Sequence, residues 1–327
     1  MTKHRPAVVP SRLRDIATWG GGRPMSDLAA FRFVRREIRE GRFQRTMALM
    51  VAFSAIVSGF EAYVQHRRGN FVDRLMWTPV WLMPPTAAGA LAAVVSRRAA
   101  HTLLPLLSLA SIADGLIGFR AHLIGIERMP GGWRLGQYNV VMGAPVFAPL
   151  LMSSVGVLGL LASVLRPAES DAKETSADSD DLEDHGGLAT RIAHGEFQRG
   201  MALTAGAFAV LAGGEAYFEH LRGSFNDRLM WTPIWLTPPM VVATAAAAVS
   251  EEAAQKVLPV ASVAILCDGL AGFALHLRGI GRMPGGFRNL DFNLTMGPPL
   301  FAPLLFASVG TLGLIASLMR RGSDGPM

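Results

Sequence analysis

The sequence predicts an all-α integral membrane protein with eight transmembrane helices, arranged as two parallel four-helix repeats. Half of the 327 residues are hydrophobic and only 17% are charged, whereas soluble domains carry about 25% charged residues. The apolar residues form runs of roughly 20 residues, long enough to cross a hydrocarbon core of ~30 Å as helices. Residues 41–165 also recur as residues 195–319 at a constant offset of 154, with 69 of 125 positions identical.

Four apolar segments in each repeat predict four helices. They span residues 46–65, 75–95, 102–124 and 140–165 in the first repeat, and 200–219, 229–249, 256–278 and 294–318 in the second. Because four is an even number, both repeats enter the membrane from the same side. This predicts a pseudo-two-fold axis along the membrane normal instead of an inverted repeat.

Prolines and small residues inside these segments predict local features of the helices. Pro84 and Pro85 fall in the second segment, and Pro145 and Pro149 in the fourth, where a missing amide donor predicts a kink. Gly118, on the third segment, allows a close helix contact. Met-Pro-Gly-Gly between the third and fourth segments predicts a tight turn, with Asn139 and its counterpart Asn293 as caps of the fourth helix.

The segments outside the two repeat domains, 46–165 and 195–319, differ in charge. Residues 1–45 are basic, and an amphipathic helix or a simple positive anchor at 26–45 are the two interpretations. Residues 166–194 are acidic and predict a disordered linker, and residues 320–327 form a short tail. The excess of Lys and Arg at the start places the N- and C-termini in the cytoplasm and the chain in the plasma (inner) membrane. No nucleic-acid-binding motif accompanies this charge, so we expect no nucleic-acid partner.

Ionisable residues inside the apolar segments are the best guide to function. They recur in both repeats, as Glu61, His66, Asp114 and His122 and as Glu215, His220, Asp268 and His276. Such groups are costly in a membrane and mark sites or pathways. Imidazole and carboxylate together suit iron, copper or zinc. We therefore predict a redox or electron-transfer protein with one transition-metal site near the outer face of each repeat, and with membrane redox subunits as partners besides the lipid bilayer.

The ligands predicted for these metal sites are Glu61, His66 and His122 in one repeat and Glu215, His220 and His276 in the other. Haem, with the two histidines of a repeat as axial ligands, is less favoured because it leaves Glu61 without a role. The single cysteine, Cys267, excludes internal disulfides and CxxC chemistry.

Other interpretations of the polar residues stay open. Asp114 and Asp268, with Glu61 and Glu215, would suit a proton or ion relay in a coupled transporter. An enzyme acting on a lipid-soluble substrate and a purely structural subunit are further alternatives. Polar residues of the outer loops are expected to be structural: Asp73, Arg74, Arg128, Asp227, Arg228 and Arg282. Glu61 could also pair with Arg128 or Arg74 instead of a metal.

Overall fold

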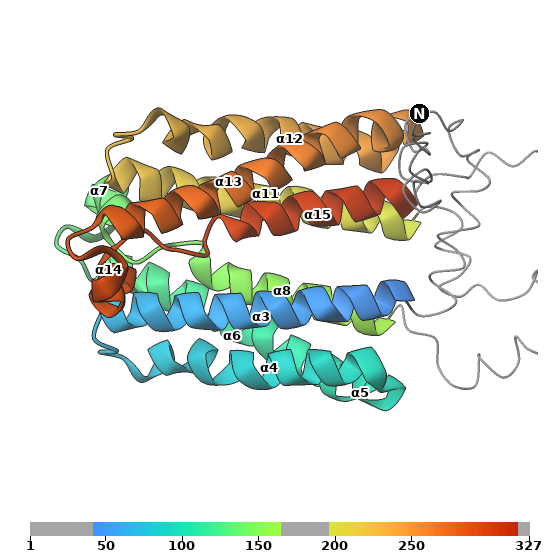
Figure 1. The fold of residues 1–327 in the computed structure, drawn as a ribbon, viewed down its shortest axis with the longest axis horizontal. Helices are drawn as coiled ribbons and strands as arrows, with labels where there is room; N and C mark the ends of the chain where they lie inside the picture. Colours follow the sequence, from blue (N-terminus) through green and yellow to red (C-terminus); the bar gives the residue numbers. More distant parts are fainter. Residues whose placement is uncertain (1–41, 165–195, 320–327) are drawn as a thin grey trace, which may run out of the picture.

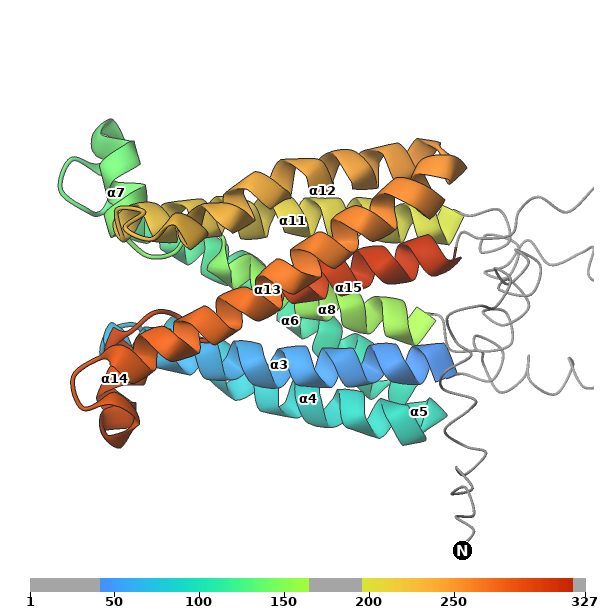
Figure 2. The same ribbon diagram turned by 45° about the horizontal axis from the view of Figure 1, so that its top comes forward.

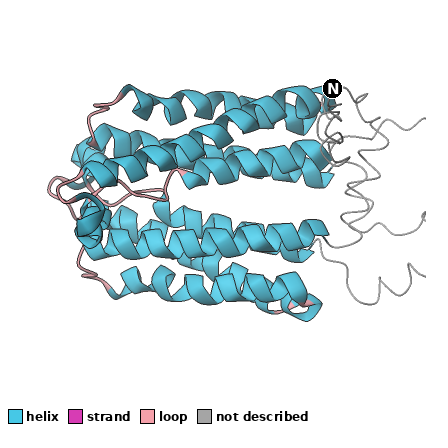
Figure 3. Cartoon of the chain, viewed as in Figure 1, coloured by secondary structure: helices cyan, strands magenta, loops and turns pink. Residues whose placement is uncertain are grey.

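The structure, a computed structural model, describes residues 42–164 and 196–319. These residues form helices and connecting turns, with no strand among them (Figure 3). The predicted amphipathic segment, apart from its last residues, the acidic linker and the C-terminal tail lie outside the described residues.

The first repeat forms a ring of four long helices. Its α-helices are α3 (Arg42–Arg68), α4 (Thr78–Val95), α5 (Arg97–His101), α6 (Leu103–Glu127), α7 (Gly136–Met142) and α8 (Ala148–Val164). The short 3₁₀ helices η2 (Arg74–Trp77) and η3 (Gly132–Leu135) join them. Helix α3 packs against α4 and α8, and α6 packs against the same two helices. Helices α3 and α6 therefore occupy opposite corners of the ring.

The second repeat has the same order of elements and the same neighbours. It comprises α11 (Glu196–Arg222), η4 (Arg228–Trp231), α12 (Thr232–Val249), the π-helical turn η5 (Ala253–Val257), α13 (Leu258–Arg282), η6 (Gly286–Asn289), α14 (Leu290–Met296) and α15 (Leu304–Met319). Helices α11 and α13 each contact α12 and α15. Figure 1 shows α7 and α14 at one end of the molecule, and the start of α3 and the end of α15 at the other.

Six helical segments in the described ranges are long and apolar enough to cross a membrane. They are Gln44–Arg68, Arg74–Val95, Arg97–Glu127, Phe197–Arg222, Arg228–Val249 and Ala253–Arg282. Apolar side chains such as Phe53, Trp81 and Leu106 are exposed on their surface. A surface of this kind is stable against lipid tails and not against water. The chain is a multi-pass membrane protein with at least these six candidate spans, whereas the two-fold axis stays a prediction.

The fourth helix of each repeat differs from the sequence prediction. A continuous segment was expected over 140–165, but the chain breaks between α7 and α8, which leaves the shorter apolar helix Ala148–Ser163. Gly143 ends α7 in an extended conformation, and Pro145 supplies no amide for a helical hydrogen bond. Pro84 and Pro85, in contrast, remain inside α4. The second repeat breaks in the same way, between α14 and α15.

The short helices after each tight turn connect the two repeats. Helix α7 of the first repeat packs on α11 of the second, and α14 of the second packs on α3 of the first. Figure 2 shows the two short helices lying beside opposite repeats. Helix α8 of the first repeat also packs on α11 of the second. We name the end of the molecule where the two short helices lie the α7/α14 end.

Candidate functional site: a central cavity and two histidine pairs

A cavity of about 730 Å³ lies between the two repeats. Its walls come from α3, α6 and α8 of the first repeat and from α11 and α15 of the second. Away from the α7/α14 end the cavity wall is mostly apolar. Towards the α7/α14 end it carries ionisable side chains, which are Glu61, His66, Arg68, Asp73, Asp114, His122, Arg128, Glu215, Glu219 and Arg222.

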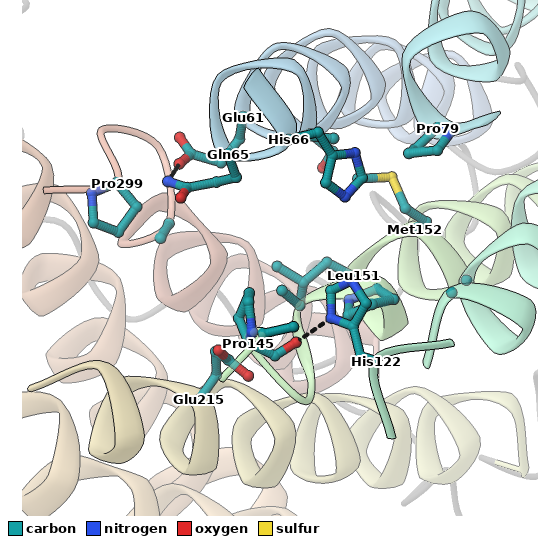
Figure 4. A pocket seen from close by; sticks show the side chains of 18 of the residues that line it. Glu61, Gln65, His66, Pro79, His122, Pro145, Leu151, Met152, Glu215 and Pro299 are labelled. Carbon is teal, nitrogen blue, oxygen red and sulfur yellow. Dashed lines mark hydrogen bonds between the residues drawn. The ribbon is translucent and has the colours of Figure 1, made fainter. Parts of the chain in front are cut away.

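Each predicted histidine is held by a hydrogen bond from its Nδ1 to a backbone carbonyl. In the first repeat His66 bonds Met76 and His122 bonds Pro145, both at 2.6 Å, and Figure 4 shows the second of these bonds. The second repeat has the same pattern: His220 bonds the Met230 carbonyl and His276 bonds the Pro299 carbonyl. Because a carbonyl oxygen only accepts, Nδ1 carries the proton in each ring and Nε2 keeps its lone pair.

The two histidines of the first repeat lie close together although they come from opposite corners of the ring. The ring centres of His66 and His122 are 6.4 Å apart, and the ring planes make an angle of 72°. Both side chains line the cavity (Figure 4). His220 and His276 are also near enough for their charges to interact.

The predicted glutamates reach across to the opposite repeat. Glu61 Oε2 accepts a hydrogen bond from the Phe301 amide at 3.0 Å, and its Oε1 accepts one from Gln65 at 2.7 Å. Glu215 Oε2 accepts one from the Phe147 amide at 2.6 Å. Phe147 and Phe301 precede α8 and α15, where free amides and the helix dipole favour a negative charge. Each carboxylate thus stabilises a helix start in the other repeat.

The Glu–His–His sets predicted as metal ligands are therefore not brought together as groups. In the described ranges, no three or more His, Cys, Asp or Glu side chains are placed to hold a metal ion. The structure instead brings the two histidines of a repeat together, while the glutamate bonds to a backbone amide of the other repeat. No ion pair joins Glu61 to Arg74 or Arg128 among the described residues, so that alternative is not realised.

The aspartates of the relay hypothesis lie within the helix packing. Asp114 lines the cavity and sits beside Thr78, and Asp268 sits beside Thr232. The adjoining Gly115 meets α8 so closely that any side chain there would collide with Pro149 and Ser153. The close helix contact expected on this face of α6 is confirmed.

Polar loop residues that recur in both repeats mostly stabilise the turns. Asp73 and Asp227 cap η2 and η4 by accepting hydrogen bonds from Leu75 and Leu229, at 2.8 and 2.9 Å. Asn139 does not cap a helix as predicted. Its Nδ2 donates to the carbonyls of Pro130 and Gly132, at 3.1 and 2.8 Å, and Asn293 does the same in the second repeat. The asparagine side chain therefore pins the Met-Pro-Gly-Gly turn to the following helix.

Four charged or amide side chains of the cavity were missed by the sequence reasoning. They are Gln65, Arg68, Glu219 and Arg222. Arg222 donates to the carbonyls of Val141 and Gly143 at the end of α7, at 2.7 and 2.5 Å. The spacing in the sequence could have revealed part of this cluster. Glu61, Gln65 and Arg68 are four and three residues apart and therefore share one face of a helix.

No family model, curated protein or solved structure matches this chain. The residues of the cavity are accordingly interpreted from their own chemistry.

Proposed function

We propose that the chain is a membrane electron-transfer protein that binds one b-type haem in each repeat, between His66 and His122 and between His220 and His276. The observation that carries the proposal is the placement of two imidazoles from opposite helices with ring centres 6.4 Å apart. This proposal replaces the Glu–His–His metal site with a site made of the histidines alone.

The number of ligands supports haem over a bare ion. Two protein ligands suffice to hold a haem iron of the cytochrome type, whereas a structural or catalytic zinc ion takes three or four. With metal–nitrogen bonds of about 2 Å, two imidazoles on opposite sides of one ion have ring centres about 6 Å apart, and tetrahedral ligands about 5 Å. The pair in the first repeat matches the opposed arrangement.

The hydrogen bonds of the histidines support the same proposal. Metal-bound histidines almost always donate the other ring nitrogen to a carboxylate, a carbonyl or water, which fixes the tautomer and the ring orientation. All four histidines donate Nδ1 to a carbonyl. The Nε2 atoms are then the available ligands.

The surroundings of His66 and His122 suit a large planar group with acidic side chains. Leu151, Met152 and Val155 supply an apolar wall. Arg128, which also lines the cavity and forms no ion pair with another described residue, could pair with a carboxylate of the bound group. A cavity of about 730 Å³ lies within the usual range of about 300–1,000 Å³ for small-molecule sites. Because the chain has one cysteine, the group would be held without thioether bonds.

Bound haem would supply one-electron redox chemistry. The chain itself would hold the group through the Nε2 atoms of the paired histidines and would exclude water with apolar helices. We place the chain in the plasma (inner) membrane with cytoplasmic termini, which puts the α7/α14 end and both histidine pairs at the outer face. Membrane redox subunits are the expected partners.

The first test is the visible spectrum and haem content of the detergent-purified protein, produced with adequate haem supply. We expect a Soret band and about two haems per chain. His66→Ala should remove about one haem, and His66→Ala with His220→Ala should remove both. His101→Ala is the matched control, because His101 is exposed on α5. A colourless wild type, or a spectrum that His66→Ala leaves unchanged, would contradict the proposal.

Ion- or proton-coupled transport is the second candidate. The observation favouring it is that Asp114, Glu61 and Glu215 line one cavity between the repeats. It predicts ion-driven proton movement in liposomes that Asp114→Asn abolishes, in a protein without haem.

A further inference from the structure

We infer that the α7/α14 end carries two equivalent binding surfaces for anionic phospholipid headgroups, one at η2 and one at η4, in which Arg74 and Arg228 bind the headgroup phosphate. Each surface combines a row of aromatic rings, which sets its depth in the membrane, with an arginine that has no partner in the described part of the chain. The inference goes beyond electron transfer, because it concerns how the chain is held in its membrane and does not involve the central cavity.

A row of three aromatic side chains leads from η2 onto the surface of α4. Phe71 stacks on Trp77 with ring centres 3.9 Å apart, and the Trp77 ring lies 6.1 Å from the Trp81 ring. The exposed fraction rises along the row, from 36% at Trp77 to 71% at Trp81. The row therefore begins against the turn and ends on the outside of the helix.

The second repeat forms the same row on a backbone that is strained in the same way. Phe225 stacks on Trp231 with ring centres 4.0 Å apart, and Trp235 follows at 6.2 Å. Phe71 and Phe225 have φ angles of 47° and 45°, in the left-handed region that bulky residues rarely adopt. Strain of this kind persists where the surrounding structure fixes it and often marks a functional position. Its presence in both repeats indicates that the placement of the rings has a role.

The two rows mark the level of the lipid headgroups. Tryptophan is enriched at membrane–water interfaces, because its ring is apolar and its N–H group is polar. Trp81 is in the first turn of α4, within the candidate span Arg74–Val95, so its exposed ring faces lipid. Trp77 precedes it and lies nearer the α7/α14 end. A charged side chain on η2 is therefore at the depth of the phosphate groups.

Arg74 and Arg228 are the first residues of η2 and η4. Both are exposed, and within the described ranges neither forms an ion pair. The neighbouring Asp73 is occupied as the cap of η2, because it accepts a hydrogen bond from the Leu75 amide at 2.8 Å. The planar guanidinium group matches two phosphate oxygens at once. Each arginine is thus available to a phosphate from outside the chain.

The turn that carries Arg74 is fixed before any lipid binds. Besides the Asp73 cap, the Thr78 hydroxyl donates to the Leu75 carbonyl at 2.8 Å, and His66 bonds the Met76 carbonyl. Little conformational freedom of the backbone is then lost when a headgroup binds, which favours affinity.

The surroundings favour lipid over a soluble acidic protein as the partner. The aromatic row continues onto the lipid-facing surface of α4, so a ligand at Arg74 is also in contact with the bilayer. Arg134 and Arg288, on η3 and η6, follow the exposed rings of Trp133 and Phe287 at the same end. Basic and aromatic side chains side by side suit an anionic headgroup layer.

The test is native mass spectrometry of the full-length protein released from nanodiscs that contain phosphatidylcholine and phosphatidylglycerol in equal amounts. We expect the wild type to retain phosphatidylglycerol preferentially. Because one arginine near an anionic surface contributes roughly fivefold in affinity, Arg74→Gln with Arg228→Gln should remove about two of the retained molecules. Both arginines are exposed, so the variant should fold, and an unchanged midpoint of thermal unfolding in pure phosphatidylcholine checks this.

Arg67→Gln is the matched control for Arg74→Gln. It removes the same charge at the same end, but the Arg67 guanidinium is already bonded to Asp291, so lipid retention should match the wild type. Equal retention in the wild type and the double variant would overturn the inference and leave these arginines to an acidic protein partner. Equal losses in Arg67→Gln and Arg74→Gln would overturn it too, as a general effect of charge. None of these measurements needs haem, so failure of this inference and failure of the electron-transfer proposal are separate results.

Discussion

Glu61 and Glu215 show how one residue type can be costly in a membrane and still be structural. Each carboxylate accepts an amide hydrogen bond from the opposite repeat, beside an aromatic contact between the repeats. Phe60 meets Phe301 edge-to-face with ring centres 5.5 Å apart, and Phe147 stacks on Phe218 at 6.3 Å. The carboxylate and the rings together fix the start of α8 or α15 against the other repeat.

Substitution of Glu61 separates this role from metal ligation. We expect Glu61→Ala to lower the free energy of unfolding by about 1–3 kcal/mol, because the Phe301 amide loses its acceptor, while haem content per folded chain stays unchanged. Thermal unfolding and haem content of the same sample measure both quantities. Loss of haem with unchanged stability would instead identify Glu61 as a ligand. Glu252→Ala, at an exposed position, should change neither.

At the scale of the elements, the contact between α6 and α8 depends on glycine. Gly115 and its counterpart Gly269 allow the backbone of the fourth helix to approach, and a side chain at either site would strike that backbone. Dispersion contacts between closely packed helices replace the hydrophobic effect as the attraction within a bilayer. We therefore expect substitutions at Gly115 and Gly269 to destabilise the protein.

Gly115→Leu tests this contact, with Gly125→Leu as the matched control on the same helix. We expect Gly115→Leu to destabilise the protein by about 1–3 kcal/mol or more through overpacking. Gly125 has no atom near its added side chain and should tolerate leucine. Midpoints of thermal unfolding in detergent compare the two variants, and equal midpoints would show that α6 and α8 can separate without cost.

The helices were more predictable than their contacts. Runs of apolar residues predicted eight membrane helices, and six of them are long and apolar enough to cross a membrane in the described ranges, because length and hydropathy are local properties. The break before α8 was predicted only as a kink, since Pro145 can kink a helix or end it depending on what satisfies the freed backbone groups. One of these backbone groups, the Phe147 amide, is satisfied by Glu215 of the other repeat, 68 residues along the chain. The histidines could be singled out because they recur in both repeats. The contact of each glutamate with the other repeat could not be predicted, because nothing in the sequence of one repeat indicates it.

At the scale of the whole molecule, the two repeats are held by reciprocal contacts. Glu61 meets Phe301, Glu215 meets Phe147, Arg222 holds the end of α7, and Arg67 forms a two-bond ion pair with Asp291. The ion pair is exposed and contributes little by itself. The buried contacts carry most of the specificity of the interface.

A nicked chain tests the strength of this interface. A protease site placed between residues 170 and 190 allows the purified protein to be cut after folding. We expect the two halves to co-elute in size-exclusion chromatography, and Glu61→Ala with Arg222→Ala to shift part of the cut protein to separate halves. An uncut double variant controls for unfolding. Separation of the cut wild type would show that the covalent connection holds the repeats together.

The broken fourth helix also has a consequence for biosynthesis. Helix α8 leaves the ribosome well before Glu215, so the amide of Phe147 lacks its final acceptor while the second repeat is still being made. The first repeat is then inserted with an uncapped helix start, a polar defect inside the bilayer. Because Phe301 comes last and Glu61 is already in place, the second defect is repaired as soon as it appears. The first repeat therefore reaches its final structure only after Glu215 has been synthesised. During this interval membrane chaperones can bind the first repeat, whereas the second repeat has no such interval.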